Sequence, residues 1–306
     1  MINKKIFRFS LAVFCLCLVM ACETRKHSLM REEKHLAAHQ LEPVAHYWRG
    51  VVYGVANGTT LTLDVSAPED QGPFPVLMII HGGEWRLNTN RAMEGMARYI
   101  ANRGYVVVNI NTRMLPEVRM EDEVGDCFSA LLWIKGNVRD YGGDPSKIAV
   151  TGDSSGGHLA AMIVTSGGNP ALPPSVAAPG KPDLAVSCAV ISYGFLDFVT
   201  MGRILPVTRR WLGKSYWQDP ARHQLFSPLR QVRPGLPPQL VVEGNLDFLY
   251  QENLKYVKAL TTAGDPVELY IAPGQAHGFL DRYWEPATQA AYDRIIAFLD
   301  RQLKGR

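Results

Sequence analysis

Six short apolar runs, rich in β-branched residues, recur along the chain and constrain its fold more than any other feature. Each run is shorter than an ordinary buried helix, and turn-forming residues bound it. Strands that are buried on both faces have this composition, because helices cover both sides of a parallel sheet. The runs occupy residues 74–80, 105–110, 147–152, 184–192, 238–244 and 267–272.

Stretches with the apolar spacing of helices separate these runs. Gly104 and Gly264 follow two of them, as expected for helices that end in a left-handed residue. Strands that alternate with helices favour right-handed crossovers, so we expect an α/β fold: a mostly parallel, doubly wound sheet with helices on both faces. An alternating stretch at 59–68 predicts one antiparallel strand with a solvent-exposed face. The predicted helices are 90–103, 119–138, 155–166, 247–263 and 286–303.

The chain is long and apolar enough for one large core. It has 306 residues, of which 47% are hydrophobic and 20% are charged. These values favour a single α/β domain, predicted at residues 49–306. Two connections within it are too long for simple turns. Residues 167–183 are rich in Gly, Pro and Ala and indicate a surface loop, whereas 198–237 is either a lid or a surface excursion.

The first 21 residues indicate a signal peptide. Three basic residues precede the apolar run 11–20, which is followed by the small residue Ala21. A helix needs roughly twenty apolar residues to span a bilayer, so this run is too short for a transmembrane anchor. The ending LVMAC resembles a bacterial lipoprotein signal. It predicts a lipid anchor on Cys22, a tether over 22–48 and a membrane-attached location in the cell envelope, periplasmic or at the cell surface. The alternative is an ordinary cleaved secretory signal.

Residues 1–21 also carry the excess positive charge of the chain. They hold three Lys or Arg residues and no acidic residue, so their removal takes the formal charge from +3 to zero. We therefore find no electrostatic case for nucleic-acid binding. Cys127 and Cys188 fall in apolar patterns and are interpreted as buried small hydrophobic residues. Whether they form a disulfide stays open.

The stretch AVTGDSSGGHLA, residues 149–160, joins a predicted strand to a predicted helix. A serine flanked by glycines two residues away on each side is typical of a nucleophile elbow, where the turn leaves no room for side chains. Ser154 has Gly152 and Gly156 in these places, whereas Ser155 would need a glycine where Asp153 stands. Ser154 is therefore the candidate nucleophile.

A serine nucleophile needs a base to take its proton, and the base needs a carboxylate to orient it. His277 follows the predicted strand 267–272, and Asp247 follows the strand 238–244, so both lie at the same edge of the sheet as Ser154. The order Ser, Asp, His is the one expected of α/β-hydrolases. Asp197 and then Glu243 are the alternative acids.

Attack on a carbonyl creates an oxyanion, which backbone N–H groups stabilise. The stretch IIHGGEWRL offers the N–H groups of Gly82 and Gly83, and the residue after the nucleophile, Ser155, offers another. His81 and His158 are interpreted as structural residues that hold the oxyanion loop and the elbow helix. Trp85 is predicted to pack under this loop, with the acyl pocket as its alternative place.

Five ordered stretches carry a resemblance to a known family. The chain resembles the α/β-hydrolase superfamily and, within it, the carboxylesterase and hormone-sensitive-lipase-like group, which also includes feruloyl and acetyl esterases. Glu84 stands where these families often have a third glycine, and Ser155 stands where alanine is common. The resemblance implies an α/β-hydrolase fold and covers residues 74–303. The matching stretches are HGGEW, NTRMLPE, GGDPSKIAVTGDSSGGHLA, GNLDFLYQEN and GQAHGF.

These residues predict a serine ester hydrolase that works through an acyl-enzyme. The resemblance and the export signal favour a small-molecule ester substrate outside the cytoplasm, such as an acylated carbohydrate. The eight histidines show no metal-ligand spacing and no glycine-rich nucleotide motif is present, so neither a metal ion nor another cofactor is expected. A peptidase or amidase of the same fold and a non-catalytic binding member are the alternatives. The acyl group, the alcohol and the oligomeric state stay open.

Overall fold

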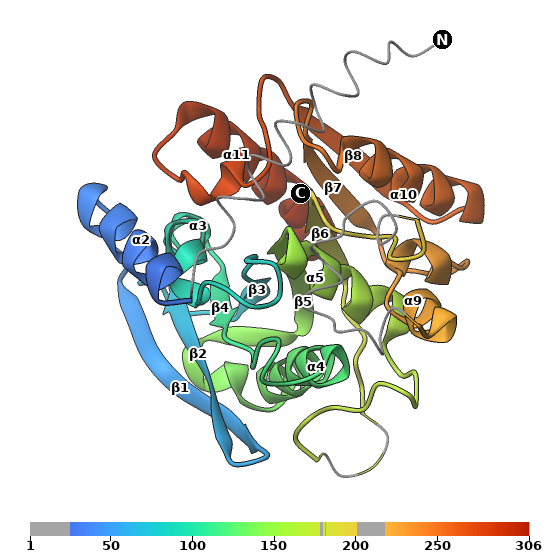
Figure 1. The fold of residues 1–306 in the computed structure, drawn as a ribbon. Helices are drawn as coiled ribbons and strands as arrows, with labels where there is room; N and C mark the ends of the chain where they lie inside the picture. Colours follow the sequence, from blue (N-terminus) through green and yellow to red (C-terminus); the bar gives the residue numbers. More distant parts are fainter. Residues whose placement is uncertain (1–24, 178–179, 181, 201–217, 306) are drawn as a thin grey trace.

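The computed structural model describes residues 25–177, 180, 182–200 and 218–305. The strands are β1 His46–Ala56, β2 Thr59–Ala67, β3 Phe74–Ile80, β4 Val106–Ile110, β5 Gly143–Asp153, β6 Cys188–Ser192, β7 Gln239–Gly244 and β8 Val267–Ala272. Within the described residues these eight strands form one sheet, in the order β1-β2-β4-β3-β5-β6-β7-β8 (Figure 1). β2 pairs antiparallel with β1 and β4, and the other neighbours are parallel. The predicted mostly parallel α/β sheet is confirmed.

Helices connect the parallel strands close to the predicted positions. A 3₁₀ turn at Asn90–Met93 precedes α3, and a π turn at Asp300–Lys304 follows α11. α10 begins at Tyr250 rather than at 247, because Asp247 lies in a turn and its carboxylate accepts the N–H of Leu249. The helices are α2 Arg25–Ala38, α3 Glu94–Ala101, α4 Met120–Asn137, α5 Ser155–Ser166, α9 Pro220–Leu225, α10 Tyr250–Ala263 and α11 Pro286–Leu299.

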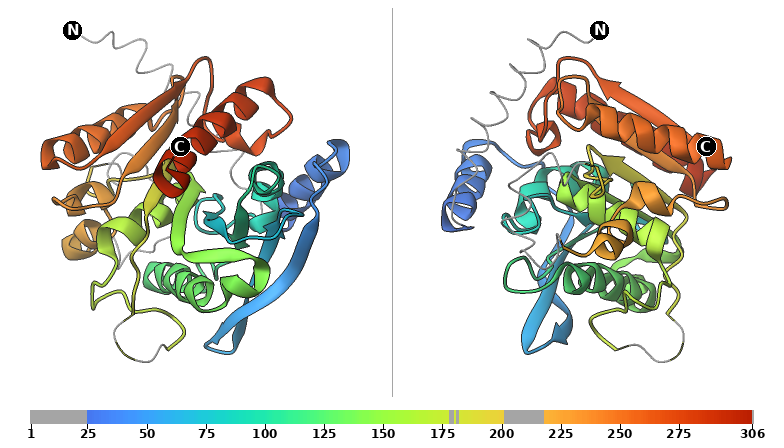
Figure 2. Two further views of the ribbon diagram at one scale, coloured as in Figure 1. Left: turned by 180° about the vertical axis from the view of Figure 1, so that it is seen from behind. Right: turned by 45° about the vertical axis from the view of Figure 1, so that its right-hand side comes forward.

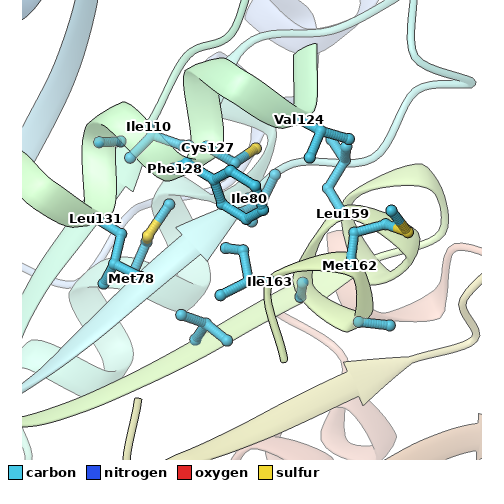
Figure 3. Close-up of a cluster of buried hydrophobic side chains, with 14 of the residues drawn as sticks. Met78, Ile80, Ile110, Val124, Cys127, Phe128, Leu131, Leu159, Met162 and Ile163 are labelled. Atoms are coloured by element: carbon cyan, nitrogen blue, oxygen red, sulfur yellow. The ribbon is translucent and has the colours of Figure 1, made fainter. Parts of the chain in front are cut away.

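Helices cover both faces of the sheet, as the two views of Figure 2 show. Met78 and Ile80 of β3 face α4 and α5 in one hydrophobic core (Figure 3), whereas Leu77 and Ile79 face α3 and α11 in the other. This alternation explains why β3 is apolar at every position: after the half-buried Phe74, each side chain is buried on one face or the other.

The cysteines of the folded part lie in these two cores. Cys127 is buried in the core with α4 and α5, and Cys188 is buried in the core with α3 and α11. Both are free thiols. Their interpretation as buried small hydrophobic residues is confirmed, and the sheet between them separates the two sulfur atoms.

The edge strand β1 has no counterpart among the predicted strands. It begins at His46, inside the 22–48 segment expected to be a tether, and pairs with β2 from there. Irregular register between Trp48 and Val51, and again between Val52 and Gly54, interrupts the two-residue alternation along β1. The sequence pattern of a strand is lost at such bulges, which is why periodicity does not reveal it.

The helix before β1 contacts the domain. The Glu32 carboxylate accepts hydrogen bonds from the N–H and the hydroxyl of Thr89, at 3.2 and 3.1 Å. Farther along, the His39 carbonyl accepts the Tyr283 hydroxyl at 2.6 Å, and the His39 ring stacks on Trp284. Among the described residues, no helix combines the length and the apolar character needed to cross a membrane.

Several predictions fall on residues that the structure does not describe. The signal peptide at 1–21 and the lipid site Cys22 lie outside the described residues, as do positions 201–217 of the proposed lid. The rest of the 198–237 connection contains α9 and a 3₁₀ turn at Pro228–Gln231. The lid therefore stays a prediction.

Candidate active site

Ser154 lies in the turn between β5 and α5, in a backbone conformation that serines rarely adopt. Its φ and ψ angles are 54° and −116°. Such strain persists only where the surroundings enforce it. Here the N–H of Ser154 donates to the Ser192 carbonyl on β6, and the carbonyl of Ser154 accepts the N–H of His158, both at 3.0 Å. The turn fixes the side chain at the carboxyl edge of the sheet.

The glycines on either side of Ser154 are required by close backbone approach. A Cβ atom at Gly152 would lie 2.2 Å from the carbonyl oxygen of Gly156. A Cβ atom at Gly156 would lie 2.1 Å from the carbonyl oxygen of Ile80, at the end of β3. The first turn of α5 therefore sits directly on β5 and β3, which is possible only without side chains at these two positions.

His277 and Asp247 complete a hydrogen-bonded chain with Ser154. The Ser154 Oγ lies 2.8 Å from His277 Nε2, and His277 Nδ1 lies 2.8 Å from Asp247 Oδ2. The other carboxylate oxygen of Asp247 accepts the N–H of Leu249 at 2.7 Å. Because a carboxylate only accepts, the neutral imidazole carries its proton on Nδ1 and leaves Nε2 free to accept from the serine. The structure brings the three predicted residues together.

The two alternative acids have other partners. The Asp197 carboxylate forms an ion pair with Arg230, with Oδ2 2.8 Å from Nη2. Glu243 is fully buried, and its Oε1 accepts the N–H of Gly244 at 2.9 Å. Neither carboxyl group is the hydrogen-bond partner of His277 Nδ1, which is Asp247.

The oxyanion loop corrects one prediction. The N–H of Gly82 donates to the buried carboxylate of Asp153 at 2.7 Å, so it is not available to an oxyanion. Gly82 is a glycine for another reason: a Cβ atom there would lie 2.5 Å from Asp153 Oδ2. The sequence reveals that a side chain is missing but not where the N–H points. Of the predicted donors, Gly83 and Ser155 remain.

Gly83 and Ser155 lie at positions where the backbone conformation is tightly restricted or the N–H has no partner within a helix. Gly83 has a φ of 122°, and a Cβ atom there would lie 2.3 Å from the carbonyl oxygen of Leu87, so only glycine fits. Ser155 is the first residue of α5, where the N–H has no partner within the helix. Glu84, at the place of the third glycine, also adopts a positive φ, of 57°.

Trp85 and His158 pack beneath this loop as predicted. The Trp85 indole N–H donates to His158 Nδ1 at 3.0 Å, so the His158 proton lies on Nε2 and donates to the Phe226 carbonyl, also at 3.0 Å. Burial lowers the pKa of His158 to about 4, which keeps the ring neutral. The indole also contacts the rings of Phe195 and Phe198. His81 is buried, with Nδ1 2.8 Å from the Gly82 carbonyl oxygen.

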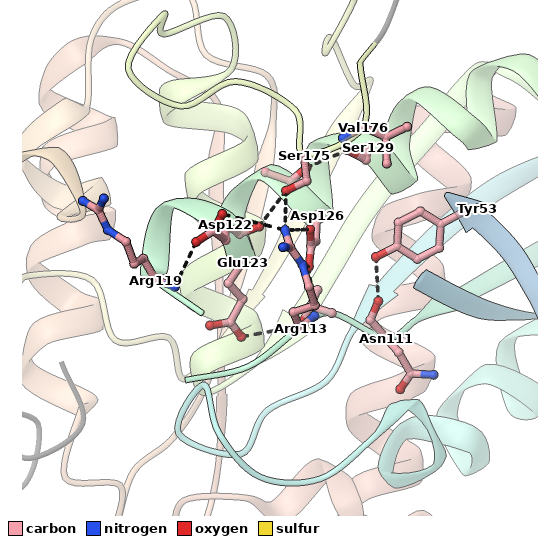
Figure 4. A network of polar contacts seen from close by, with 12 residues as sticks. Tyr53, Asn111, Arg113, Arg119, Asp122, Glu123, Asp126, Ser129, Ser175 and Val176 are labelled. Carbon is pink, nitrogen blue, oxygen red and sulfur yellow. Dashed lines mark hydrogen bonds and ion pairs between the residues drawn. The ribbon is translucent and has the colours of Figure 1, made fainter. Parts of the chain in front are cut away.

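The sequence analysis did not predict the Arg113–Asp126 ion pair, which supports the oxyanion loop through the segment that follows β4. Arg113 donates to Asp126 of α4 through Nε at 3.0 Å and through Nη2 at 2.7 Å, and Nη2 also donates to Ser175 (Figure 4). This pair holds the segment after β4, where the N–H of Leu115 donates to the Trp85 carbonyl at 2.8 Å. The sequence feature that could have indicated this ion pair is Arg113. It lies in the stretch NTRMLPE and has no catalytic role.

A cavity of about 810 Å³ adjoins this segment. Five threonines and two asparagines line much of it, so its walls offer neutral hydrogen-bond donors and acceptors. Across the described part of the chain, no group of three or more His, Cys, Asp or Glu side chains is placed to hold a metal ion. The cavity is lined by Asn57, Thr59, Thr60, Leu61, Thr62, Thr89, Asn111, Thr112, Arg113, Met114, Pro116, Glu117, Val118, Arg119 and Asp122.

Several known proteins with similar sequences or structures are named as esterases. The esterase LipQ of Mycobacterium tuberculosis is 30% identical over 261 residues, which are 81% of this chain and 61% of that protein. The chain spans about half to three fifths of the length of LipQ and two further curated relatives. An arylesterase of Saccharolobus solfataricus is 30% identical over 72% of this chain and 73% of its own length.

The structural comparison agrees with the sequence comparison. The solved structure of a thermophilic esterase from Thermogutta terrifontis superposes with a TM-score of 0.69 and 26% identity, over 86% of this chain and 95% of that one. The predicted α/β-hydrolase fold is thereby confirmed. Residues 63–254, more than half of the chain, match the BD-FAE family model. The chain therefore belongs to the BD-FAE family, within the carboxylesterase-like group of the α/β-hydrolases.

Proposed function

We propose that this protein is a serine ester hydrolase in which Ser154 is the nucleophile, His277 the general base and Asp247 the residue that orients the base. The observation that carries the proposal is the unbroken chain of two 2.8 Å hydrogen bonds from Ser154 Oγ to Asp247. It occurs at a strained elbow whose flanking glycines allow α5 to begin directly against β5 and β3. The esterase names of the relatives support ester rather than amide bonds as the substrate.

The reaction proceeds in two halves. The Ser154 oxygen attacks the ester carbonyl as its proton moves to His277 Nε2, and the N–H groups of Gly83 and Ser155 stabilise the oxyanion. The imidazolium then protonates the departing alcohol, which leaves an acyl-serine. Water gives its proton to His277, attacks the acyl carbon and releases the acid, and the proton returns to Ser154. Asp247 stabilises the imidazolium in both halves.

The adjacent serines provide the test. Hydrolysis of p-nitrophenyl esters from acetate to octanoate should fall by at least about 10³-fold in Ser154→Ala, as expected when the nucleophile of a triad is removed. Ser155→Ala is the matched control: it keeps its backbone N–H and should retain most of the activity. Equal activity in wild type and Ser154→Ala would refute the proposal. Cleavage of p-nitroanilides alone would indicate an amidase, and no labelling by a fluorophosphonate probe would indicate a binding protein.

For the alcohol part of the substrate we propose an acylated carbohydrate. The cavity lined by threonines and asparagines includes Met114, which precedes the Leu115 bonded to the Trp85 carbonyl, and hydroxyl and amide groups suit the hydroxyls of a sugar. Thr60→Trp should fill part of this cavity. It should lower kcat/KM for an acetylated sugar and leave p-nitrophenyl acetate hydrolysis unchanged. A parallel loss on both substrates, or on neither, would contradict this assignment.

We further propose that the protein acts outside the cytoplasm, held to a membrane by lipid on Cys22. The support is the sequence of residues 1–22, with a basic start, a short apolar run and the ending LVMAC. Metabolic labelling with palmitate should mark the wild-type protein and not Cys22→Ser. An unlabelled wild-type protein that is still processed would indicate the ordinary secretory signal instead.

A further inference from the structure

Glu243 is a fully buried carboxyl group next to the proposed acid. It is the penultimate residue of β7, a strand with β6 on one side and β8 on the other. The chain then turns, with the N–H of Asp247 donating to the Gly244 carbonyl at 3.0 Å. Burial, the negative charge of Asp247 and a side-chain hydrogen bond with it are among the causes that raise the pKa of Glu243. The mechanism above gives Glu243 no role.

The hydrogen bonds of Glu243 are incomplete if the group is ionised. Its Oε1 accepts the N–H of Gly244, but Oε2 is buried and has no donor among the described residues. A buried oxygen that bears charge and has no donor is costly. A proton on Oε2 removes the charge and turns the oxygen into a donor, and the acceptor within reach is the carboxylate of Asp247.

The neighbouring charges decide which of the two carboxyl groups holds a proton. Asp247 already accepts hydrogen bonds from His277 and from the N–H of Leu249, one on each carboxylate oxygen. Glu243 is faced by the carboxyl groups of Asp247 and of Glu252 on α10. Burial first, and then the negative charge of Asp247, raise the pKa of Glu243 to about 9.

We propose that Glu243 is a positioning residue: its protonated carboxyl group donates a hydrogen bond to Asp247 and thereby fixes the carboxylate that orients His277. Glu243 does not touch the substrate. It acts on the reaction by limiting the rotation of Asp247 and by withdrawing part of the negative charge that His277 would otherwise face. This inference rests on the proposed function for its catalytic consequence, but the protonation of Glu243 does not depend on that function.

Two substitutions separate the hydrogen bond from the size of the side chain. Glu243→Gln keeps an N–H donor for Asp247 and an acceptor for Gly244, so kcat should stay close to wild type at neutral pH. Glu243→Leu removes the donor and should lower kcat by about 10- to 100-fold with KM unchanged, the effect of a lost hydrogen bond to a charged group. The acid limb of the kcat/KM profile should shift to higher pH in the leucine variant alone, because His277 then faces the full charge of Asp247.

Glu123 on α4 provides the control for loss of a buried carboxyl group. It is buried, its carboxylate lies 3.5 Å from the Thr112 hydroxyl, and burial raises its pKa. Glu123→Gln should leave the acid limb in place. Two results would overturn the inference: a leucine variant with wild-type kcat and an unchanged acid limb, or a glutamine variant as impaired as the leucine variant.

A second measurement tests the protonation without any substrate. In the folded protein Glu243 keeps its proton up to about pH 9, whereas in the unfolded chain it loses the proton near pH 4.5. Unfolding therefore releases this proton at neutral pH, and stability falls as pH rises through that window. The free energy of unfolding, measured in urea at pH 6, 7 and 8, should depend less on pH in Glu243→Gln than in wild type. The difference should correspond to the release of up to one proton on unfolding. Equal slopes would overturn the inference even if the protein is an active esterase.

Discussion

Ser154 lies between two regions that are held in place by different means. On one side, the backbone of the oxyanion loop lies so close to the Asp153 carboxylate and the Leu87 carbonyl that Gly82 and Gly83 cannot carry a side chain. On the other side, Asp247 and His277 are positioned by hydrogen bonds between side chains and to the backbone. One added carbon atom should therefore disable the first region, whereas the second should fail when the chemistry of a group changes at constant size.

The largest effect is expected on the hydrogen-bonded side. Asp247→Asn keeps the size of the side chain, but its amide nitrogen cannot accept from His277 Nδ1, so the histidine adopts the wrong tautomer. In the comparable variant of a serine protease this exchange lowers kcat by about 10⁴-fold, and we expect a loss of that order. The measurement is kcat for p-nitrophenyl acetate with the fold checked by circular dichroism.

Asp197→Asn is the matched control for this exchange. Asp197 also follows a strand at the same edge of the sheet, but its carboxylate pairs with Arg230. The control should lose stability and retain most of its kcat. A reversed pattern, with Asp197→Asn inactive and Asp247→Asn active, would make Asp197 the acid.

A smaller loss of kcat is expected from a change in the oxyanion loop. Gly83→Ala adds a Cβ atom that would lie 2.3 Å from the Leu87 carbonyl oxygen, at a φ that alanine rarely adopts. The loop must move, and the loss of one oxyanion donor costs about 10² to 10³-fold in kcat. Single-turnover acylation kinetics would locate the loss in the chemical step.

Gly264→Ala is the control that separates the loss of kcat in Gly83→Ala from the loss of stability that alanine causes at any position with a positive φ. Gly264 has a φ of 82° at the end of α10, with no atom within 4 Å of an added Cβ. The variant should be less stable and fully active. If Gly83→Ala kept wild-type kcat, the oxyanion would have to be held by other groups.

The same contrast explains what the sequence could predict. The nucleophile can be identified because Gly152 and Gly156 stand beside Ser154 in the sequence, although the contact that requires Gly156 is with the distant carbonyl oxygen of Ile80. The role of Gly82 cannot be predicted in this way, because its N–H donates to Asp153, which is 71 residues away in the chain. The choice between Asp247 and Asp197 also depends on tertiary structure, since both follow strands and only the fold pairs one of them with His277.

The secondary structure could likewise be predicted where its signal lies in the local sequence. The runs that became β3 to β8 are apolar because both faces of the sheet are covered, and this signal is strong in each run. The edge strand β1 was missed because its irregular register breaks the alternation. The sequence indicates Glu243 only as an alternative acid, because it does not show that Oε2 of Glu243 lacks a donor.

His158 joins the backbone-held oxyanion loop to the connection before β7, and it gives the smallest expected effect. Its ring accepts from Trp85 and donates to Phe226, an arrangement that only the neutral imidazole provides. Burial lowers the pKa of His158 to about 4, below the ordinary value of 6.5 for histidine. Between these values the unfolded chain binds a proton and the folded protein does not, so acidification destabilises the fold by up to about 1.4 kcal/mol per pH unit.

His158→Gln tests this dependence, because its amide accepts and donates in the same directions but does not titrate. Urea unfolding between pH 6.5 and 4 should show a shallower loss of stability in the variant than in wild type, while the two proteins should differ little above pH 7, where the imidazole is neutral in both states. If the free energy of unfolding changed equally with pH in both proteins, His158 would be protonated in the folded protein. The Trp85 bond would then be broken at acid pH, and the oxyanion loop would depend on its glycines, the Asp153 carboxylate and the segment held by the Arg113–Asp126 ion pair.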